Sequence, residues 1–305
     1  MKRNIYSYSK LWMIFLVLMG AACTNQVEDA IPVSGQPIEF SVLSDWKEIP
    51  NTRSNPGKTQ FKDSDSIQIF GFHTSFPGGV KKVQKFMYRV GEQARGQKVG
   101  FDGKDWNYSP KRFWPKEGTL DFYASYPDYS VLNEGDKMTY VQPDFNPLGV
   151  DLLWGLATDR NCAKAEIVPI WMVHALAKVN IFFDSSLGDI KKVIVSAYKA
   201  GYFSIAADNG VPIWSIDDKK GFQEATFESS SKIYDVTVFI LPKKINGLTM
   251  YGDNNTLIDD ASEKLQQPQY TFEAGKEYNL TISKGVQKKN TNSRSIAMSV
   301  RCVSE

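Results

Sequence analysis

The stretch Ala177-Lys178-Val179-Asn180-Ile181-Phe182-Phe183 decides the fold class of this chain. Apolar residues occupy every second position from Ala177 to Phe183, and this period of two predicts a β-strand with one face against a core. Valine, isoleucine and phenylalanine are also residues that fit a pleated, half-buried surface. We therefore expect residues 177–183 to form a strand.

Short segments of the same kind recur along the chain. They are rich in Val, Ile, Phe, Tyr and Thr, and turn-forming residues separate them, whereas no long stretch has the period of a helix. Repeated short strands favour β-sandwiches over parallel βαβ units, so the sequence predicts an all-β protein. Further strands are predicted at 38–42, 66–72, 119–126, 191–198, 234–241 and 278–283.

The first 22 residues have the features of a secretory signal. Basic residues precede an apolar run, 11–22, which is too short to span a bilayer. Cys23 directly follows the small residues Gly20-Ala21-Ala22, as in bacterial lipoprotein signals, although leucine is usual where Gly20 stands. We predict that Cys23 becomes an acylated, palmitate-bearing N-terminus. Ordinary secretion with an incidental cysteine is the alternative.

The remaining chain is long enough for two domains of ordinary size. A polar stretch, 159–165, separates two groups of predicted strands, and the chain turns polar again after residue 282. The predicted division is a signal peptide at 1–22, a lipidated linker at 23–35, β-sandwiches at 36–162 and 163–283, and a polar linker with a terminal strand at 284–305.

Charge and motifs exclude several classes of function. The chain has 36 basic and 34 acidic residues, and the basic ones are scattered, which gives no case for nucleic-acid binding. The two histidines, His73 and His174, have no partners at metal-site spacing, and no nucleophile elbow or phosphate-binding loop occurs. We predict no enzymatic activity, no metal and no cofactor, and interpret His174 as structural. Whether Cys162 and Cys302 form a disulfide stays open.

An aromatic stretch at 106–115 has two interpretations. Trp106, Tyr108 and Trp114 could stack on sugars if their rings are exposed, or they could close one end of a sandwich core, which we favour. Pro110 and Pro115 make the segment irregular or an edge of a sheet.

The same stretch, extended to 127, carries a pattern of Trp-x-Tyr, Pro, an aromatic followed by Trp-Pro, Gly, and Phe-x-Ala-x-Tyr-Pro. With this pattern the chain resembles the fimbrillin-like family of Gram-negative gut and oral anaerobes. Other pieces follow in the family's order, although Gly155 replaces the usual alanine of the first. These pieces are Asp-Leu-Leu-Trp-Gly at 151–155, His-Ala-Leu-Ala-Lys-Val at 174–179, Phe-Ile-Leu-Pro at 239–242 and a closing strand at 275–282.

The resemblance implies two tandem transthyretin-like β-sandwiches in a lipoprotein on the surface of the outer membrane, as a pilus (fimbrial) subunit or an adhesin. Its implied partners are neighbouring subunits, the outer membrane and a surface receptor. Polymerising members lose an N-terminal strand to an Arg-specific protease, and a strand from the next subunit fills the groove. The alternative function is a monomeric surface lipoprotein that binds glycans through Trp106, Tyr108 and Trp114.

Applied to this chain, the resemblance gives three candidate positions for that exchange. The removable strand would contain Ile38, Phe40 and Val42, and the cleavage point would be Arg53 in a polar, turn-forming segment. The terminal run after the polar linker alternates and could be the donated strand, or it could complete its own domain. The apolar face of that run consists of Ile296, Met298, Val300 and Cys302.

Overall fold

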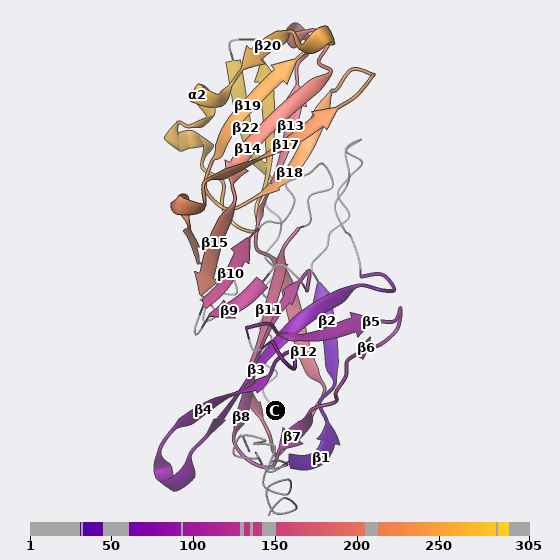
Figure 1. Ribbon diagram of the computed structural model, residues 1–305, viewed down its shortest axis with the longest axis vertical. Coiled ribbons are helices and arrows are strands. Elements are labelled where there is room, and N and C mark those ends of the chain that lie inside the picture. Colours follow the sequence, from indigo (N-terminus) through magenta and orange to yellow (C-terminus); the bar gives the residue numbers. More distant parts are fainter. Residues whose placement is uncertain are drawn as a thin grey trace, which may run out of the picture.

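The computed structural model describes residues 31, 33–44, 61–92, 94–128, 131–134, 137–141, 151–204, 213–284 and 286–292. Within these ranges the chain consists of β-strands joined by turns, short 3-10 segments and one short helix, α2 (Ser262–Leu265). The molecule is elongated, with an N-terminal and a C-terminal part stacked along the long axis (Figure 1).

The N-terminal part is built around a large sheet in the order β2-β12-β11-β8-β3-β5-β6, and β4 pairs with β3. Strands β2 and β6 stand at opposite ends of this order and still approach each other, so the sheet curls around its core. A two-stranded sheet of β1 and β7 lies beside it. These strands are β1 (Val33–Pro37), β2 (Phe40–Ser44), β3 (Ser66–Ser75), β4 (Lys82–Met87), β5 (Gln97–Phe101), β6 (Trp106–Asn107), β7 (Phe113–Pro115), β8 (Thr119–Tyr126), β11 (Leu153–Asn161) and β12 (Val168–His174).

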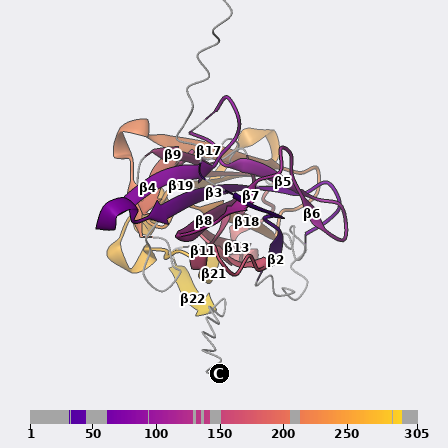
Figure 2. The ribbon, with the colours of Figure 1, turned by 90° about the horizontal axis from the view of Figure 1, so that it is seen from below.

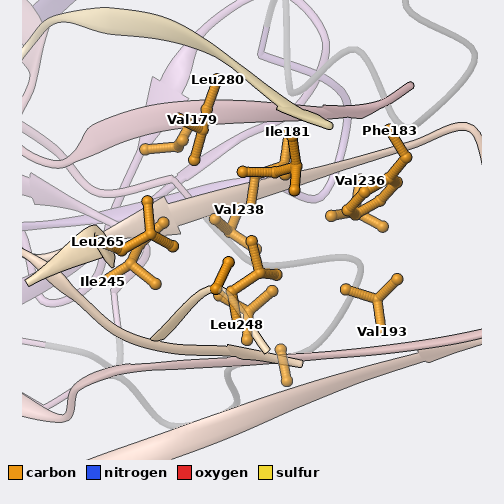
Figure 3. Packing of buried hydrophobic residues seen from close by; sticks show 14 of the residues in the cluster. Val179, Ile181, Phe183, Val193, Val236, Val238, Ile245, Leu248, Leu265 and Leu280 are labelled. Carbon is orange, nitrogen blue, oxygen red and sulfur yellow. The ribbon is translucent and has the colours of Figure 1, made fainter. Parts of the chain in front are cut away.

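The C-terminal part is a sandwich of two four-stranded sheets, in the orders β18-β13-β21-β22 and β17-β14-β19-β20. Val179 and Ile181 of one sheet face Val193 and Leu248 of the other, and all four are fully buried (Figure 3). The strands are β13 (Ala177–Phe183), β14 (Lys192–Tyr198), β17 (Phe222–Glu228), β18 (Asp235–Ile240), β19 (Ile245–Tyr251), β20 (Leu257–Asp260), β21 (Glu277–Ser283) and β22 (Val286–Asn292).

A third unit joins the two parts. Strands β9 (Val131–Glu134) and β10 (Lys137–Val141) pair through β10 with β15 (Ala200–Ser204), which in turn pairs with β16 (Trp214–Ile216). This small sheet lies between the two parts in Figure 1. A separate buried cluster, which we call the bridging cluster, collects residues from both sides. It consists of Phe70, Leu152, Trp154, Val173, Ala175, Leu176, Phe203, Phe239 and Leu241.

The all-β prediction is confirmed, and the sheets are arranged as sandwiches. The predicted strands at 119–126 and 177–183 coincide with β8 and β13. The division expected after residue 162 does not fall where the sheets change, because β12 still pairs with β11 and β2 in the N-terminal sheet. The change comes at residues 175–176, where β12 passes directly into β13.

Candidate functional site

The segment 33–44 runs along an edge of the N-terminal part. Its first strand, β1, pairs antiparallel with β7, and its second, β2, pairs parallel with β12. Between them, the amide of Ile38 donates to the carbonyl of Arg112 at 2.9 Å, and the amide of Val168 donates to the carbonyl of Glu39 at 2.9 Å. Because β2 is a terminal strand of its sheet, its backbone forms sheet hydrogen bonds along only one side within the described part of the chain.

Alternate side chains of this segment fill the N-terminal core. Ile38, Phe40 and Val42 are 0%, 6% and 8% exposed, while Leu43 on the opposite face is 49% exposed. The ring of Phe40 meets Phe122 edge-on, with centroids 5.3 Å apart. The three side chains therefore occupy a groove whose floor belongs to the rest of the domain, and the removable strand predicted from the sequence lies in that groove.

Tyr108 contacts the segment 33–44 through both its hydroxyl and its ring. Its hydroxyl donates to the carbonyl oxygen of Ile38 at 2.8 Å, and its ring lies 5.9 Å from that of Phe40. Burial raises the pKa of Tyr108 to about 12. The hydroxyl thus stays protonated, and able to donate, throughout the neutral pH range.

A pocket of about 670 Å³ opens where β2 and β6 approach each other. Its wall on the β2 side includes Glu39 and Ser41, and Trp106 and Asn107 form the β6 side. Residues from both faces of β2 line this pocket, including the core residues Phe40 and Val42. The remaining lining residues are Phe101, Lys104, Asp105, Lys111 and Ile167.

The three aromatic residues considered for glycan stacking are buried. Trp106, Tyr108 and Trp114 are 9%, 7% and 2% exposed and belong to the N-terminal core. Trp106 packs edge-on against Phe61 at 4.9 Å between centroids. This packing agrees with the core interpretation and leaves none of the three an exposed ring face for a sugar.

Several predicted positions lie outside the described residues. They are Cys23, Arg53 and the donor-strand residues Ile296, Met298, Val300 and Cys302. The nearest described residues are Ser44 and Phe61 around Arg53, and Asn292 at the end of β22. Lipidation, cleavage and strand donation stay predictions.

The remaining sequence candidates occupy structural positions. His174 forms a short hydrogen bond through Nδ1 with Asp151, and both side chains are largely buried. Cys162 is a free, buried thiol whose pKa burial raises to about 11, so it is neutral at pH 7. Cys302, whose pairing with Cys162 the sequence left open, is outside the described residues.

A buried polar cluster escaped the sequence analysis. Lys178 is fully buried, and its Nζ lies 3.1 Å from Oε1 of Glu277. The amide of Asn180 donates to the same carboxylate at 2.6 Å and accepts from Thr237 at 2.9 Å. The sequence shows that the polar residues of 177–183 share one face of that strand. Alternation alone, however, predicts that such a face is exposed to solvent rather than buried.

Two classes of site have no support in the described residues. In the described ranges, no group of three or more His, Cys, Asp or Glu side chains could hold a metal ion. No helix within them is long and apolar enough to cross a membrane.

These features define an all-β protein whose N-terminal edge segment is buried in a groove of its own domain. The model of the fimbrillin-like family matches residues 52–297, and the chain therefore belongs to the fimbrillin-like family. No curated protein matches the sequence.

Solved structures resemble this chain at low sequence identity. A candidate cell adhesion protein from Bacteroides uniformis superposes with a TM-score of 0.53 at 15% identity, over 84% of this chain and 96% of that one. Two fimbrial proteins of Porphyromonas gingivalis also match. The tip protein has a TM-score of 0.40 at 8% identity, over 75% of this chain and 93% of that one. The anchor protein has a TM-score of 0.37 at 9% identity, over 84% and 98%.

Proposed function

We propose that this protein is a non-enzymatic pilus or adhesin subunit of the cell surface that assembles by exchange of a β-strand between subunits. One observation carries the proposal. The segment 38–42 inserts three alternate apolar side chains into a groove, yet among the described strands β2 is hydrogen-bonded along one side only. Membership of the fimbrillin-like family supports a role as a pilus or adhesin subunit at the cell surface.

The exchange would proceed at the edge of the N-terminal sheet. Cleavage at Arg53 would fall between β2 and the strands that follow it, so the segment 33–44 could leave without a break in any other described strand. Its departure would uncover the groove that Ile38, Phe40 and Val42 now fill. An incoming strand could then replace the hydrogen bonds to β12 and fill the same groove with alternate side chains.

The terminal run of the chain has the pattern that such a donor needs. Ile296, Met298 and Val300 repeat the spacing of Ile38, Phe40 and Val42, with small or polar residues between them. Acylation of Cys23 would hold the uncleaved subunit on the outer membrane, and cleavage at Arg53 would release it for polymerisation. In this proposal the chain contains two sandwich domains, which the bridging cluster couples to each other.

The first test is intact mass and N-terminal sequencing of the protein recovered from its own cell surface. An N-terminus at Ser54 is expected if the strand is removed for polymerisation. An acylated Cys23 with Arg53 intact, in material isolated from fibres, contradicts the exchange.

A reconstitution tests the exchange directly. The mature chain is cut with an Arg-specific protease and incubated with a synthetic peptide of residues 293–305. We expect stable incorporation of this peptide and of a Ser299→Asp peptide, and no incorporation of a Met298→Asp peptide. In a bound strand the alternation of the sequence would turn Ser299 away from the groove and Met298 into it. An Arg53→Lys chain should neither be cut at residue 53 nor take up peptide. Equal uptake of both aspartate peptides would refute the groove model.

A further inference from the structure

The hairpin of β3 and β4 extends away from the body of the N-terminal part. Strand β3 also pairs with β8 and β5, whereas among the described strands β4 pairs with β3 alone. In Figure 1 the turn of this hairpin projects past the rest of the molecule at its lower end, and Figure 2 shows it reaching out to one side. The turn is thus accessible to a large partner.

The tip of the hairpin is apolar and exposed. Phe76, Val80 and Val83 are 60%, 69% and 54% exposed. The turn itself is ordered by hydrogen bonds, from the amide of Gly79 to the carbonyl of Phe76 at 3.1 Å and from Val80 to Pro77 at 3.2 Å. A fixed backbone therefore holds these apolar side chains in solvent.

The charged residues within the hairpin itself are all basic. From Ser66 to Gly91 the chain contains no acidic residue, and its charged residues are Lys81, Lys82, Lys85 and Arg89. An apolar tip flanked by lysines is the composition of segments that lie in the headgroup region of an anionic bilayer.

The position of the tip relative to the predicted lipid anchor points to the same partner. Strand β1 begins at Val33, ten residues after Cys23, and lies at the lower end of the molecule with the hairpin tip (Figure 1). Ten residues of extended chain reach about 33 Å. An acylated Cys23 would therefore keep this end of the molecule close to the membrane.

We infer that the tip of the β3–β4 hairpin is a second membrane contact, which inserts Phe76 and Val80 among the anionic headgroups of the bilayer that holds Cys23. The inference rests on the proposed lipid anchor. Contact at two points would fix the orientation of the subunit on the membrane before cleavage, whereas a single lipid anchor at Cys23 would not.

The test uses the mature chain, residues 23–305, with Cys23→Ser, so that no acyl chain contributes to binding. Co-sedimentation is measured with vesicles of phosphatidylcholine alone and with added phosphatidylglycerol. We expect binding to the anionic vesicles, falling about fivefold for each of Lys81→Ala and Lys82→Ala. The double variant Phe76→Ser, Val80→Ser should bind at least tenfold more weakly. Leu257→Ser, which alters a residue 58% exposed in β20, is the matched control and should bind as the parent does.

Insertion is measured separately with an environment-sensitive fluorophore on Phe76→Cys, in a chain whose native cysteines are replaced. A blue shift on anionic vesicles and none on dextran sulfate is expected. Absence of vesicle binding, equal losses in the hairpin and Leu257 variants, or the same response to dextran sulfate would each overturn the inference.

Acylation of Cys23 is determined independently by intact mass. An acylated Cys23 without hairpin-dependent vesicle binding overturns this inference alone and leaves the proposed function standing. Hairpin-dependent binding with an unacylated Cys23 supports the membrane contact and overturns the anchor.

Discussion

Among single residues, Tyr108 forms a side-chain hydrogen bond to the segment 33–44, which we propose is removed. Its hydroxyl donates to Ile38 from within the core, so Tyr108→Phe leaves that buried carbonyl without this donor. We expect a loss of about 1 kcal/mol in the free energy of unfolding and faster amide exchange in residues 38–43. Tyr234→Phe, which alters an exposed tyrosine, is the control and should change neither quantity.

The same residue predicts a dependence on pH. The pKa of Tyr108 is 10.0 in a model peptide and about 12 in the fold, so the unfolded chain loses this proton first as the pH rises. The free energy of unfolding should therefore fall between pH 10 and pH 12, and Tyr108→Phe should fall less than the wild type. Urea unfolding at several pH values measures the difference, and parallel pH profiles for the two chains would contradict the assignment.

At Gly155 this chain has glycine where the family pattern has alanine, and the structure leaves no space for a Cβ there. A Cβ at this position would lie 2.5 Å from the carbonyl oxygen of Trp171 and 2.9 Å from Ile170. Although alanine is usual in the resembling motif, Gly155→Ala should destabilise this protein by about 1–3 kcal/mol through overpacking. Gly100→Ala is a matched control, because the nearest atom to its Cβ would be 3.9 Å away. Chemical denaturation of both variants decides, and equal stabilities would refute the close packing.

The buried pair of Lys178 and Glu277 should be far more sensitive than a surface pair of the same type. Glu277→Ala removes the carboxylate 3.1 Å from a fully buried ammonium, with an expected cost of about 3–5 kcal/mol. Glu273→Ala removes the exposed partner of Lys276 and should cost less than about 1 kcal/mol. Urea unfolding gives both values. Similar small losses would mean that Glu277 contributes little to the charge balance around Lys178.

At the scale of the strand, substitutions on the two faces of β2 distinguish the contribution of a side chain that fills the groove from that of the strand backbone. Phe40 points into the core against Phe122, and Ser41 points outward next to it. Phe40→Ala should cost about 3–5 kcal/mol, and it should raise amide exchange in β2 more than in β12. Ser41→Ala should have almost no effect. The proposed exchange requires β2 to detach while β12 stays in its sheet. Equal increases in amide exchange along both strands of the Phe40 variant would contradict this.

Strands with clear alternation could be predicted from the sequence, because apolar residues at every second position identify the buried face. β8 and β13 have the predicted bounds, whereas the strand expected at 38–42 is β2 at Phe40–Ser44. Which strands pair could not be predicted. The parallel pairing of β2 with β12 and the antiparallel pairing of β10 with β15 join residues far apart in the chain, and no local pattern encodes such contacts. The burial of Lys178 depends in the same way on how the sheets are packed.

At the scale of the whole molecule, the two parts are joined by more than a linker. The bridging cluster contains Trp154 from β11 and Phe203 from β15, both fully buried, with ring centroids 5.6 Å apart. The indole N–H of Trp214 donates to the carbonyl of Ala175 at 2.9 Å, exactly where β12 gives way to β13. A subunit built in this way can transmit force along its long axis, because an apolar interface and a shared sheet resist separation of the parts.

The bridging cluster should therefore determine whether the chain unfolds in one step. We expect a single calorimetric transition for the wild type, and two transitions for Phe203→Ala, because the cavity removes the interface that couples the parts. Phe227→Ala is the control. Its side chain lies in the C-terminal core alone, so a cavity there should lower the transition temperature without splitting the transition. If Phe203→Ala also unfolds in one step, shifted as far as Phe227→Ala, the parts are coupled through the backbone connection and the shared sheet of β10 and β15, and the cluster contributes only stability.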